Sequence, residues 1–230
     1  MVGSTIVNID SSDATVHINM SEKAQVRGKI SVEKSDKLGI DALNLRMEPQ
    51  SGIGTLMGRD TPQIMMIRDG SFTISQIMPG SYLFILEDEN LSYYLKEVEC
   101  GGTDYTVRPV EIEVGTKLDC RVTVSQDVGN ITGAVSDGDK PLPGLYVIAI
   151  PQSRTLRENP QYTSTEKTDA DGHFEMKVIP GDYFLFAVRP NDQDSYYALD
   201  FAERNLPSAE RVSVKPGDTR TVPLKPTSPQ

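Results

Sequence analysis

Polar and apolar residues alternate in the same order in two separate stretches of the chain. Residues 68–85 and 169–186 both contain Asp-Gly-x-Phe, an alternating segment, Pro-Gly-x-Tyr and a second alternating segment. A period of two is typical of a β-strand with one buried face, and Asp-Gly and Pro-Gly are favoured in tight turns. The two stretches therefore predict strands joined by short turns, which is the pattern of a β-sandwich.

Other positions match at the same separation of about 100 residues, so the two stretches belong to a longer repeat. Gly28 and Gly133 lie in similar apolar contexts, and Tyr-Tyr pairs stand at 93–94 and 196–197. A chain of 230 residues has room for two domains of this size. We therefore expect an all-β chain with two tandem Ig-like sandwich domains, at residues 24–127 and 128–226.

Each expected domain ends in a pair of short alternating segments. Their apolar positions are Ile112, Val114, Val122 and Val124 in the first domain, and Val212, Val214, Val222 and Leu224 in the second. The same alternation occurs at residues 7–20, without a repeat before it, and is expected to form an orphan β-hairpin. Residues 1–23 are expected either to close a preceding repeat of a longer array or to add strands to the first domain, and residues 227–230 to form a Pro-rich tail.

The second repeat contains four motifs in an order that is typical of one family. They are Gly-Ala-Val-Ser-Asp at 133–137, Lys-Pro-Leu-Pro-Gly-Leu-Tyr-Val at 140–147, Thr-Asp-Ala-Asp-Gly-His-Phe at 168–174, and Pro-Gly-Asp-Tyr at 180–183. This repeat resembles the carboxypeptidase regulatory-like domain, a transthyretin-related sandwich of seven strands. The first repeat keeps Gly28, Gly70, Phe72 and the Pro-Gly-Ser-Tyr turn at 79–82, but has Ile-Asp-Ala-Leu at 40–43 where the family has Pro-Leu-Pro-Gly.

Tandem copies of this domain are found in extracytoplasmic proteins of acidobacterial type, and the two repeats are similar to them. The resemblance implies a transthyretin-like fold and a non-enzymatic accessory role in a secreted, cell-surface or outer-membrane-associated bacterial protein. Other domains of a longer array, or another surface protein, would then be the partners.

Composition argues against several other classes. A formal net charge of −10 and an isoelectric point near 4.7 repel phosphate backbones and anionic lipids, so we expect no nucleic-acid partner. No apolar run approaches the roughly 20 residues that a membrane-spanning helix needs, so insertion in a membrane is not expected. The stretch Met1-Val2-Gly3-Ser4 has neither the basic nor the apolar region of a signal peptide, and we expect no such peptide in this chain.

Residues for catalysis or metal binding are sparse. The chain has two histidines, His17 and His173, which lie on different repeats, so we expect no catalytic residues, no cofactor and no metal site. Asp169 and Asp171 begin an Asp-x-Asp-Gly sequence that occurs in calcium loops, but no Glu follows at the closing position. These two aspartates are therefore expected to belong to a turn.

Two cysteines, Cys100 and Cys120, are too few for a disulfide scaffold or a four-thiolate zinc site. They are expected to form either one disulfide or two buried thiols. A bridge would close a loop of about 20 residues and stabilise the fold by roughly 3 kcal/mol. An oxidised pair would also support export from the cytoplasm.

Four residues are candidates for contact with a ligand. Neighbouring strand residues point to opposite faces, so one ring of each Tyr-Tyr pair, Tyr94 and Tyr197, is a candidate for stacking against a sugar. Arg157 and Tyr162 lie in a weakly periodic segment, 154–165, that predicts a long loop. The first hypothesis is a structural or interaction module, a stalk or spacer; the alternative is a carbohydrate-binding accessory module with a polysaccharide partner.

Overall fold

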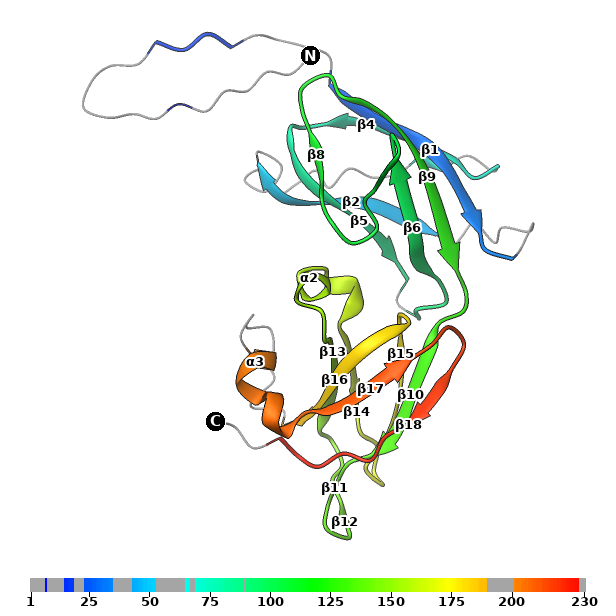
Figure 1. The fold of residues 1–230 in the computed structure, drawn as a ribbon, viewed down its shortest axis with the longest axis vertical. Coiled ribbons are helices and arrows are strands. Elements are labelled where there is room, and N and C mark those ends of the chain that lie inside the picture. Colours follow the sequence, from blue (N-terminus) through cyan, green and yellow to red (C-terminus); the bar gives the residue numbers. More distant parts are fainter. Residues whose placement is uncertain are drawn as a thin grey trace. The chain divides into compact units, whose positions relative to one another are not determined.

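The computed structural model describes residues 7, 15–18, 23–34, 43–52, 65–66, 69–88, 90–189 and 201–227. In this part of the chain the long elements are all strands, and the chain divides into two compact units (Figure 1). Unit 1 comprises residues 1–88 and 95–125, and unit 2 comprises residues 89–94 and 126–230. The all-β fold is thus confirmed, whereas most of the orphan hairpin lies outside the described residues and the expected domain boundaries stay predictions.

Unit 1 contains two sheets. The larger has the spatial order β3 (Met65–Met66), β4 (Ser71–Ile77), β1 (Ala24–Val32), β9 (Lys117–Ser125), β6 (Tyr94–Cys100) and β7 (Thr103–Asp104). The smaller has the order β2 (Asn44–Gly52), β5 (Gly80–Glu87) and β8 (Val110–Ile112). The first strand, β1, pairs antiparallel with β4 and parallel with β9.

Unit 2 has the same arrangement around its first strand. One sheet has the order β15 (His173–Val178), β10 (Gly129–Ala134) and β18 (Thr219–Thr221), and the other has β14 (Ser164–Lys167), β13 (Tyr146–Pro151), β16 (Gly181–Val188) and β17 (Glu210–Val214). The first strand, β10, pairs antiparallel with β15 and parallel with β18. A small hairpin of β11 (Ser136–Asp137) and β12 (Lys140–Pro141) follows β10.

Short helical turns occur in unit 2. They are α2 (Arg154–Arg157), η2 (Pro160–Tyr162), α3 (Phe201–Asn205) and η4 (Leu206–Ser208). The segment 154–165, which was expected to be a long loop, therefore contains α2 and η2 and ends in the first residues of β14. Asn159 supports η2 because its side chain accepts a hydrogen bond from the backbone N–H of Gln161 at 3.1 Å.

A buried tyrosine holds the Pro-Gly turn in each unit. Tyr82 Oη donates a hydrogen bond to the carbonyl oxygen of Met78 at 2.9 Å, and Tyr183 Oη donates to that of Ile179 at 2.6 Å. A buried hydroxyl without an acceptor would cost free energy, and the carbonyl four residues earlier supplies one locally. The hydrogen bond therefore fixes the turns that lead into β5 and β16.

A glycine on the first strand of each unit allows close packing. Gly28 lies opposite Phe72, and Gly133 lies opposite Phe174. A Cβ atom at Gly28 would lie 2.8 Å from the Phe72 ring and 2.1 Å from the carbonyl oxygen of Cys120. A Cβ atom at Gly133 would lie 2.8 Å from the Phe174 ring and 2.0 Å from a carbonyl oxygen of the neighbouring chain segment. Both positions thus require glycine because of the close approach of neighbouring strands.

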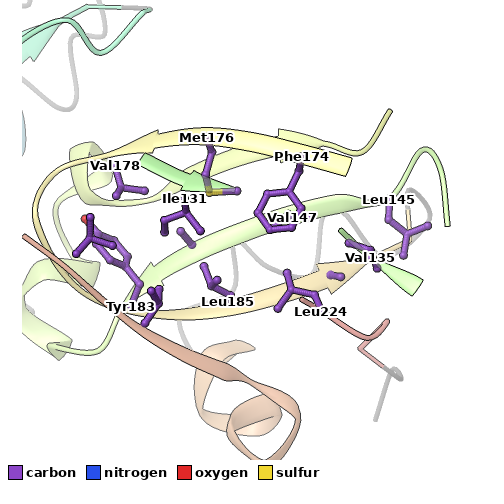
Figure 2. Packing of buried hydrophobic residues seen from close by; sticks show 14 residues of the cluster. Ile131, Val135, Leu145, Val147, Phe174, Met176, Val178, Tyr183, Leu185 and Leu224 are labelled. Atoms are coloured by element: carbon purple, nitrogen blue, oxygen red, sulfur yellow. The ribbon is translucent and has the colours of Figure 1, made fainter. Parts of the chain in front are cut away.

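The main core of unit 2 lies between its two sheets. Figure 2 shows side chains of one layer, such as Ile131 and Val178, together with side chains of the other, such as Val147 and Leu185. Leu224, which follows β18, joins this core. Apolar positions that alternate along the two repeated stretches are buried, as a strand with one buried face predicts: Phe72, Ile74, Ile77, Tyr82, Phe84, Leu86, Tyr183, Leu185 and Ala187.

The long strands β5 and β16 are buried on both faces, which the alternating pattern does not predict. Six consecutive residues are buried in each strand. In unit 2, Phe184 and Phe186 on the second face of β16 pack in a separate apolar cluster with Phe201 of α3. The ring centroids of Phe186 and Phe201 lie 5.2 Å apart in an edge-to-face arrangement. The helical segment after β16 therefore covers the outer face of this sheet.

Candidate functional site

The residues expected to contact a ligand do not form an exposed surface in the described part of the chain. Tyr94 is 7% exposed and Tyr162 is 8% exposed. The side chain of Arg157 is 12% exposed. Tyr197 lies outside the described residues. An aromatic platform for a sugar requires exposed rings, and neither of the two described tyrosines presents one.

Arg157 is bound within unit 2. Its Nε donates to the carbonyl oxygen of Pro151 at 2.8 Å, and its Nη2 donates to that of Gln152 at 3.0 Å. Its Nη1 lies 3.1 Å from Oε1 of Glu203, and its guanidinium lies 5.6 Å from the centre of the Phe184 ring. Because all three of these nitrogens have acceptors, Arg157 connects α2 to the end of β13 and to α3.

Glu203 is the acidic partner in this cluster, and no sequence motif pointed to it. Its carboxylate also lies 2.8 Å from Nε of Arg154, whose side chain is 80% exposed. The hydrogen bond from Arg154, with a smaller contribution from Arg157, lowers the pKa of Glu203 below its ordinary value. The cluster therefore acts as an internal tie between helical segments, with no free guanidinium group on Arg157 for a ligand.

The Asp-x-Asp-Gly sequence forms a turn through Asp169. Oδ1 of Asp169 accepts backbone hydrogen bonds from Asp171 at 2.9 Å and from His173 at 2.8 Å. Gly172 adopts a positive φ of 78°, the conformation that glycine favours in such turns. The carboxylate of Asp169 is thereby used to hold the turn that leads into β15.

Within the described residues, no group of three or more His, Cys, Asp or Glu side chains converges where a metal ion could bind. In that same part of the chain, no helix combines the length and apolar character needed to cross a membrane.

The side chains of the two histidines, His17 and His173, are both exposed to solvent.

Cys100 and Cys120 form a disulfide in unit 1. Their sulfur atoms are 2.01 Å apart and their Cα atoms 4.1 Å apart. Cys100 is the last residue of β6 and Cys120 lies in β9, which is the neighbouring strand in the sheet. Both residues are buried, at 2% and 4% exposure. The bond therefore joins the outer strand pair β6–β7 to the strand that β1 also contacts.

A surface depression of about 790 Å³ is lined by residues of β10, β15 and β18, together with Glu166 and Lys167 of β14. Thr132, His173, Glu175 and Thr221 are among its lining residues. The two threonine hydroxyls are 3.0 Å apart, and Glu175 accepts a hydrogen bond from Asn130 Nδ2 at 2.8 Å. Along β10 and β15 these residues alternate with buried ones, so the sequence could have indicated that they face solvent. Their spacing in the sequence does not indicate a depression.

No known protein-family model matches the chain, and the comparison with curated protein sequences also finds no match. Among solved structures, the chain is similar to GBS52, the minor pilin of Streptococcus agalactiae, with 13% identity, 90% of this chain and 98% of that chain covered, and a TM-score of 0.38. It is also similar to the shaft pilin SpaA of Lactobacillus rhamnosus GG, with 8% identity, coverage of 92% and 100%, and a TM-score of 0.28.

The Bacillus anthracis TIE protein is a third similar structure, with 13% identity, 87% of this chain covered and a TM-score of 0.30. The chain spans only 33% of the length of that protein. TM-scores of 0.28 to 0.38 are too low to establish a common overall fold. The fold class therefore rests on the strand order and pairing described above.

Proposed function

We propose that the chain is a non-catalytic structural module, a stalk or spacer, of a secreted or cell-surface protein. The observation that carries this proposal is the parallel pairing of the first and last strands in each unit, β1 with β9 and β10 with β18. In a parallel pair, the start of one strand lies at the opposite end from the finish of the other. The chain therefore enters and leaves each unit at opposite ends of this strand pair, as a spacer in series requires.

Two further observations support the proposal. The same tyrosine turn and the same glycine–phenylalanine packing occur in both units, as expected for tandem copies of one domain of carboxypeptidase regulatory-like type. The disulfide between Cys100 and Cys120 favours an oxidising compartment outside the cytoplasm. Other domains of a longer array, or another surface protein, would then be the partners.

A carbohydrate-binding accessory role is the second candidate, and the depression on unit 2 is the observation that favours it. Its opening is lined by hydroxyl and carboxylate groups that can bind sugar hydroxyls, including Thr132, Thr221 and Glu175. Tyr94, one of the two residues considered for stacking against a sugar, is buried, and the other, Tyr197, lies outside the described residues. The spacer therefore remains the first candidate.

One experiment on cells that make the protein addresses location and redox state together. Intact cells are treated with a protease, and released peptides are mapped under non-reducing conditions. A peptide containing linked Cys100 and Cys120 in the released fraction is the expected result. Release only after lysis, with both thiols free, would contradict an extracytoplasmic spacer.

A second experiment separates the spacer from the carbohydrate-binding candidate. The purified chain is tested on a glycan array and against insoluble polysaccharides, beside a Thr132→Lys/Thr221→Lys variant that fills the depression. We expect no specific binding by either protein. Binding by the natural chain that the double variant lacks would favour the carbohydrate-binding role.

A further inference from the structure

In unit 1, strands β1 and β9 pair as a parallel ladder, which we call the terminal clamp. It matches Gln25–Val32 with Lys117–Val124, residue by residue. Backbone hydrogen bonds extend it at both ends, from Gln25 N–H to the Thr116 carbonyl and from Glu33 N–H to the Val124 carbonyl, each at 2.8 Å. The clamp thus joins the first strand of unit 1 directly to its last strand.

The direction of the two strands decides how a pulling force would act on this clamp. Gln25 lies beside Lys117 at one end of the ladder, and Val32 lies beside Val124 at the other. A force applied before β1 and after β9 therefore pulls the two strands past each other along their length. Because this force acts along the strands and across the direction of their hydrogen bonds, it loads the evenly spaced bonds of the parallel pair together.

Packing of one face of the clamp against the core supports this load. Val26 and Ile30 of β1 and Val122 and Val124 of β9 are at most 1% exposed, so sliding would also disrupt the buried core. The absence of a side chain at Gly28 lets β9 approach closely at the middle of the ladder.

Unit 2 has a shorter form of the same arrangement. Its continuous register covers three residue pairs, Asn130–Thr132 with Thr219–Thr221, and a separate parallel bridge joins Val135 to Leu224. Backbone hydrogen bonds also link Val222 N–H to the Thr132 carbonyl, Leu224 N–H to the Ala134 carbonyl and Ser136 N–H to the Leu224 carbonyl. The chain then crosses to the other sheet, where Thr227 N–H donates to the carbonyl of Ala187 at 2.7 Å. This contact involves the first residue of the expected Pro-rich tail, residues 227–230.

We propose that the terminal clamp makes unit 1 a load-bearing element that resists force transmitted along the chain. The proposal rests on the proposed spacer function, because a spacer in series is the setting in which force enters at one end of the unit and leaves at the other. Unit 2, whose parallel register is shorter, yields at a lower force. Forced unfolding is governed by the unfolding barrier, which depends on how many bonds break in the same step.

The test compares two pulling directions on the same folded protein. Azide-bearing residues for handle attachment are placed at Lys23 and Gln126 in one full-length variant, and at Lys23 and Lys117 in the other. The first pair loads β1 and β9 in opposite directions along their length. The second pair pulls on the adjacent starts of the two strands, so that hydrogen bonds open one after another.

We expect the rupture force of unit 1 at equal pulling speed to be several-fold higher for the 23/126 variant than for the 23/117 variant. Thermal melts of both variants are compared with the natural chain, so that a loss of folding is recognised before force is applied. Equal rupture forces in the two directions, or a lower force for the 23/126 variant, would overturn the proposal that the terminal clamp bears the load. That outcome would leave the spacer proposal standing, because the protease mapping and glycan binding measure it independently.

Discussion

Gly28 and Gly133 are constrained by neighbouring backbone atoms more than by their own conformations. An added methyl group would lie 2.1 Å and 2.0 Å from carbonyl oxygens, which cannot rotate away as a side chain can. We therefore expect Gly28→Ala and Gly133→Ala each to lower the free energy of unfolding of its own unit by about 1–3 kcal/mol or more. Urea unfolding followed by circular dichroism measures the change.

Gly181→Ala is the matched control for these two substitutions. Its added Cβ would lie 3.5 Å from the nearest atom of Tyr183, an ordinary contact distance, and its φ is not in the left-handed region. We expect a change within about 0.5 kcal/mol. Equal losses in all three variants would show that the close approach at Gly28 and Gly133 is not the cause.

The buried tyrosines predict a loss of stability at alkaline pH. Burial raises the pKa of Tyr183, with a smaller contribution from Tyr162, and burial also raises the pKa of Tyr82. In the unfolded chain both hydroxyls ionise near pH 10, so the unfolded state loses protons first. Their contribution to stability is therefore complete below about pH 10 and is lost as the pH rises further.

The measurement for this prediction is the free energy of unfolding between about pH 8 and 11. The Tyr82→Phe/Tyr183→Phe variant is expected to lose roughly 1 kcal/mol per hydrogen bond at pH 8 and to show a flatter decline at higher pH. An equally steep decline in the variant would assign the alkaline transition to other groups.

The alternation of polar and apolar residues predicted individual buried positions. It did not predict ion pairs between residues that are far apart in the sequence. Phe72, Ile74 and Ile77 are buried as their parity indicates, because a period of two follows directly from strand geometry. Arg157 and Glu203 are 46 residues apart in the sequence, and their pairing depends on where α2 and α3 meet. Such a contact has no local signal in the sequence.

At the scale of elements, Arg157 holds α2 against unit 2 more strongly than Arg154 does. Both arginines bind Glu203, but only Arg157 also donates to the carbonyl oxygens of Pro151 and Gln152. Arg157→Ala is expected to reduce the free energy of unfolding of unit 2 by about 1.5–3 kcal/mol, because it leaves acceptors without a charged donor.

Arg154→Ala is the control, with an expected effect within about 0.5 kcal/mol since this side chain is exposed. Hydrogen exchange at the amides of 154–163 gives a local measurement of the same tie. Faster exchange in both variants would argue against a special role for Arg157.

The disulfide should matter for unit 1 alone. It attaches β6 to β9, so replacing Cys100 and Cys120 with alanine is expected to destabilise unit 1 by roughly 3 kcal/mol, the value for a loop of this size. Chemical unfolding with and without reductant provides the measurement. The unfolding transition of unit 2, which contains no cysteine, serves as the internal control. An equal shift in both transitions would contradict the expectation that the disulfide stabilises unit 1 alone.

The segments that follow the two Tyr-Tyr pairs, where they are described, differ in structure. In unit 1 the segment continues as β6, with Leu95, Val98 and Cys100 buried. In unit 2 the next element within the described residues after β16 is instead α3, Phe201–Asn205, which packs on the face of the other sheet. Phe-Ala-Glu-Arg-Asn lacks the β-branched residues that favour a strand, and this difference outweighs the shared Tyr-Tyr landmark.

For the whole molecule, stretching single chains tests the mechanical role of the two units. The quantity measured is the length of chain released when each unit unfolds. The full chain is held by handles at its two ends and stretched until both units unfold. Each unit has its own core, so two separate unfolding steps are expected. The step for unit 1 is identified by its response to reductant, because the two cysteines both lie in this unit.

With the disulfide intact, the 20-residue separation between Cys100 and Cys120 is bypassed and cannot be extended. Reduction should therefore lengthen the unit 1 step by roughly 65 Å, since an extended chain spans about 3.3–3.6 Å per residue, and leave the unit 2 step unchanged. The step that lengthens is also expected to occur at the higher force, because its terminal clamp has the longer parallel register. A longer step at the lower force would leave the disulfide assigned to unit 1 and would refute the expectation that unit 1 unfolds at the higher force.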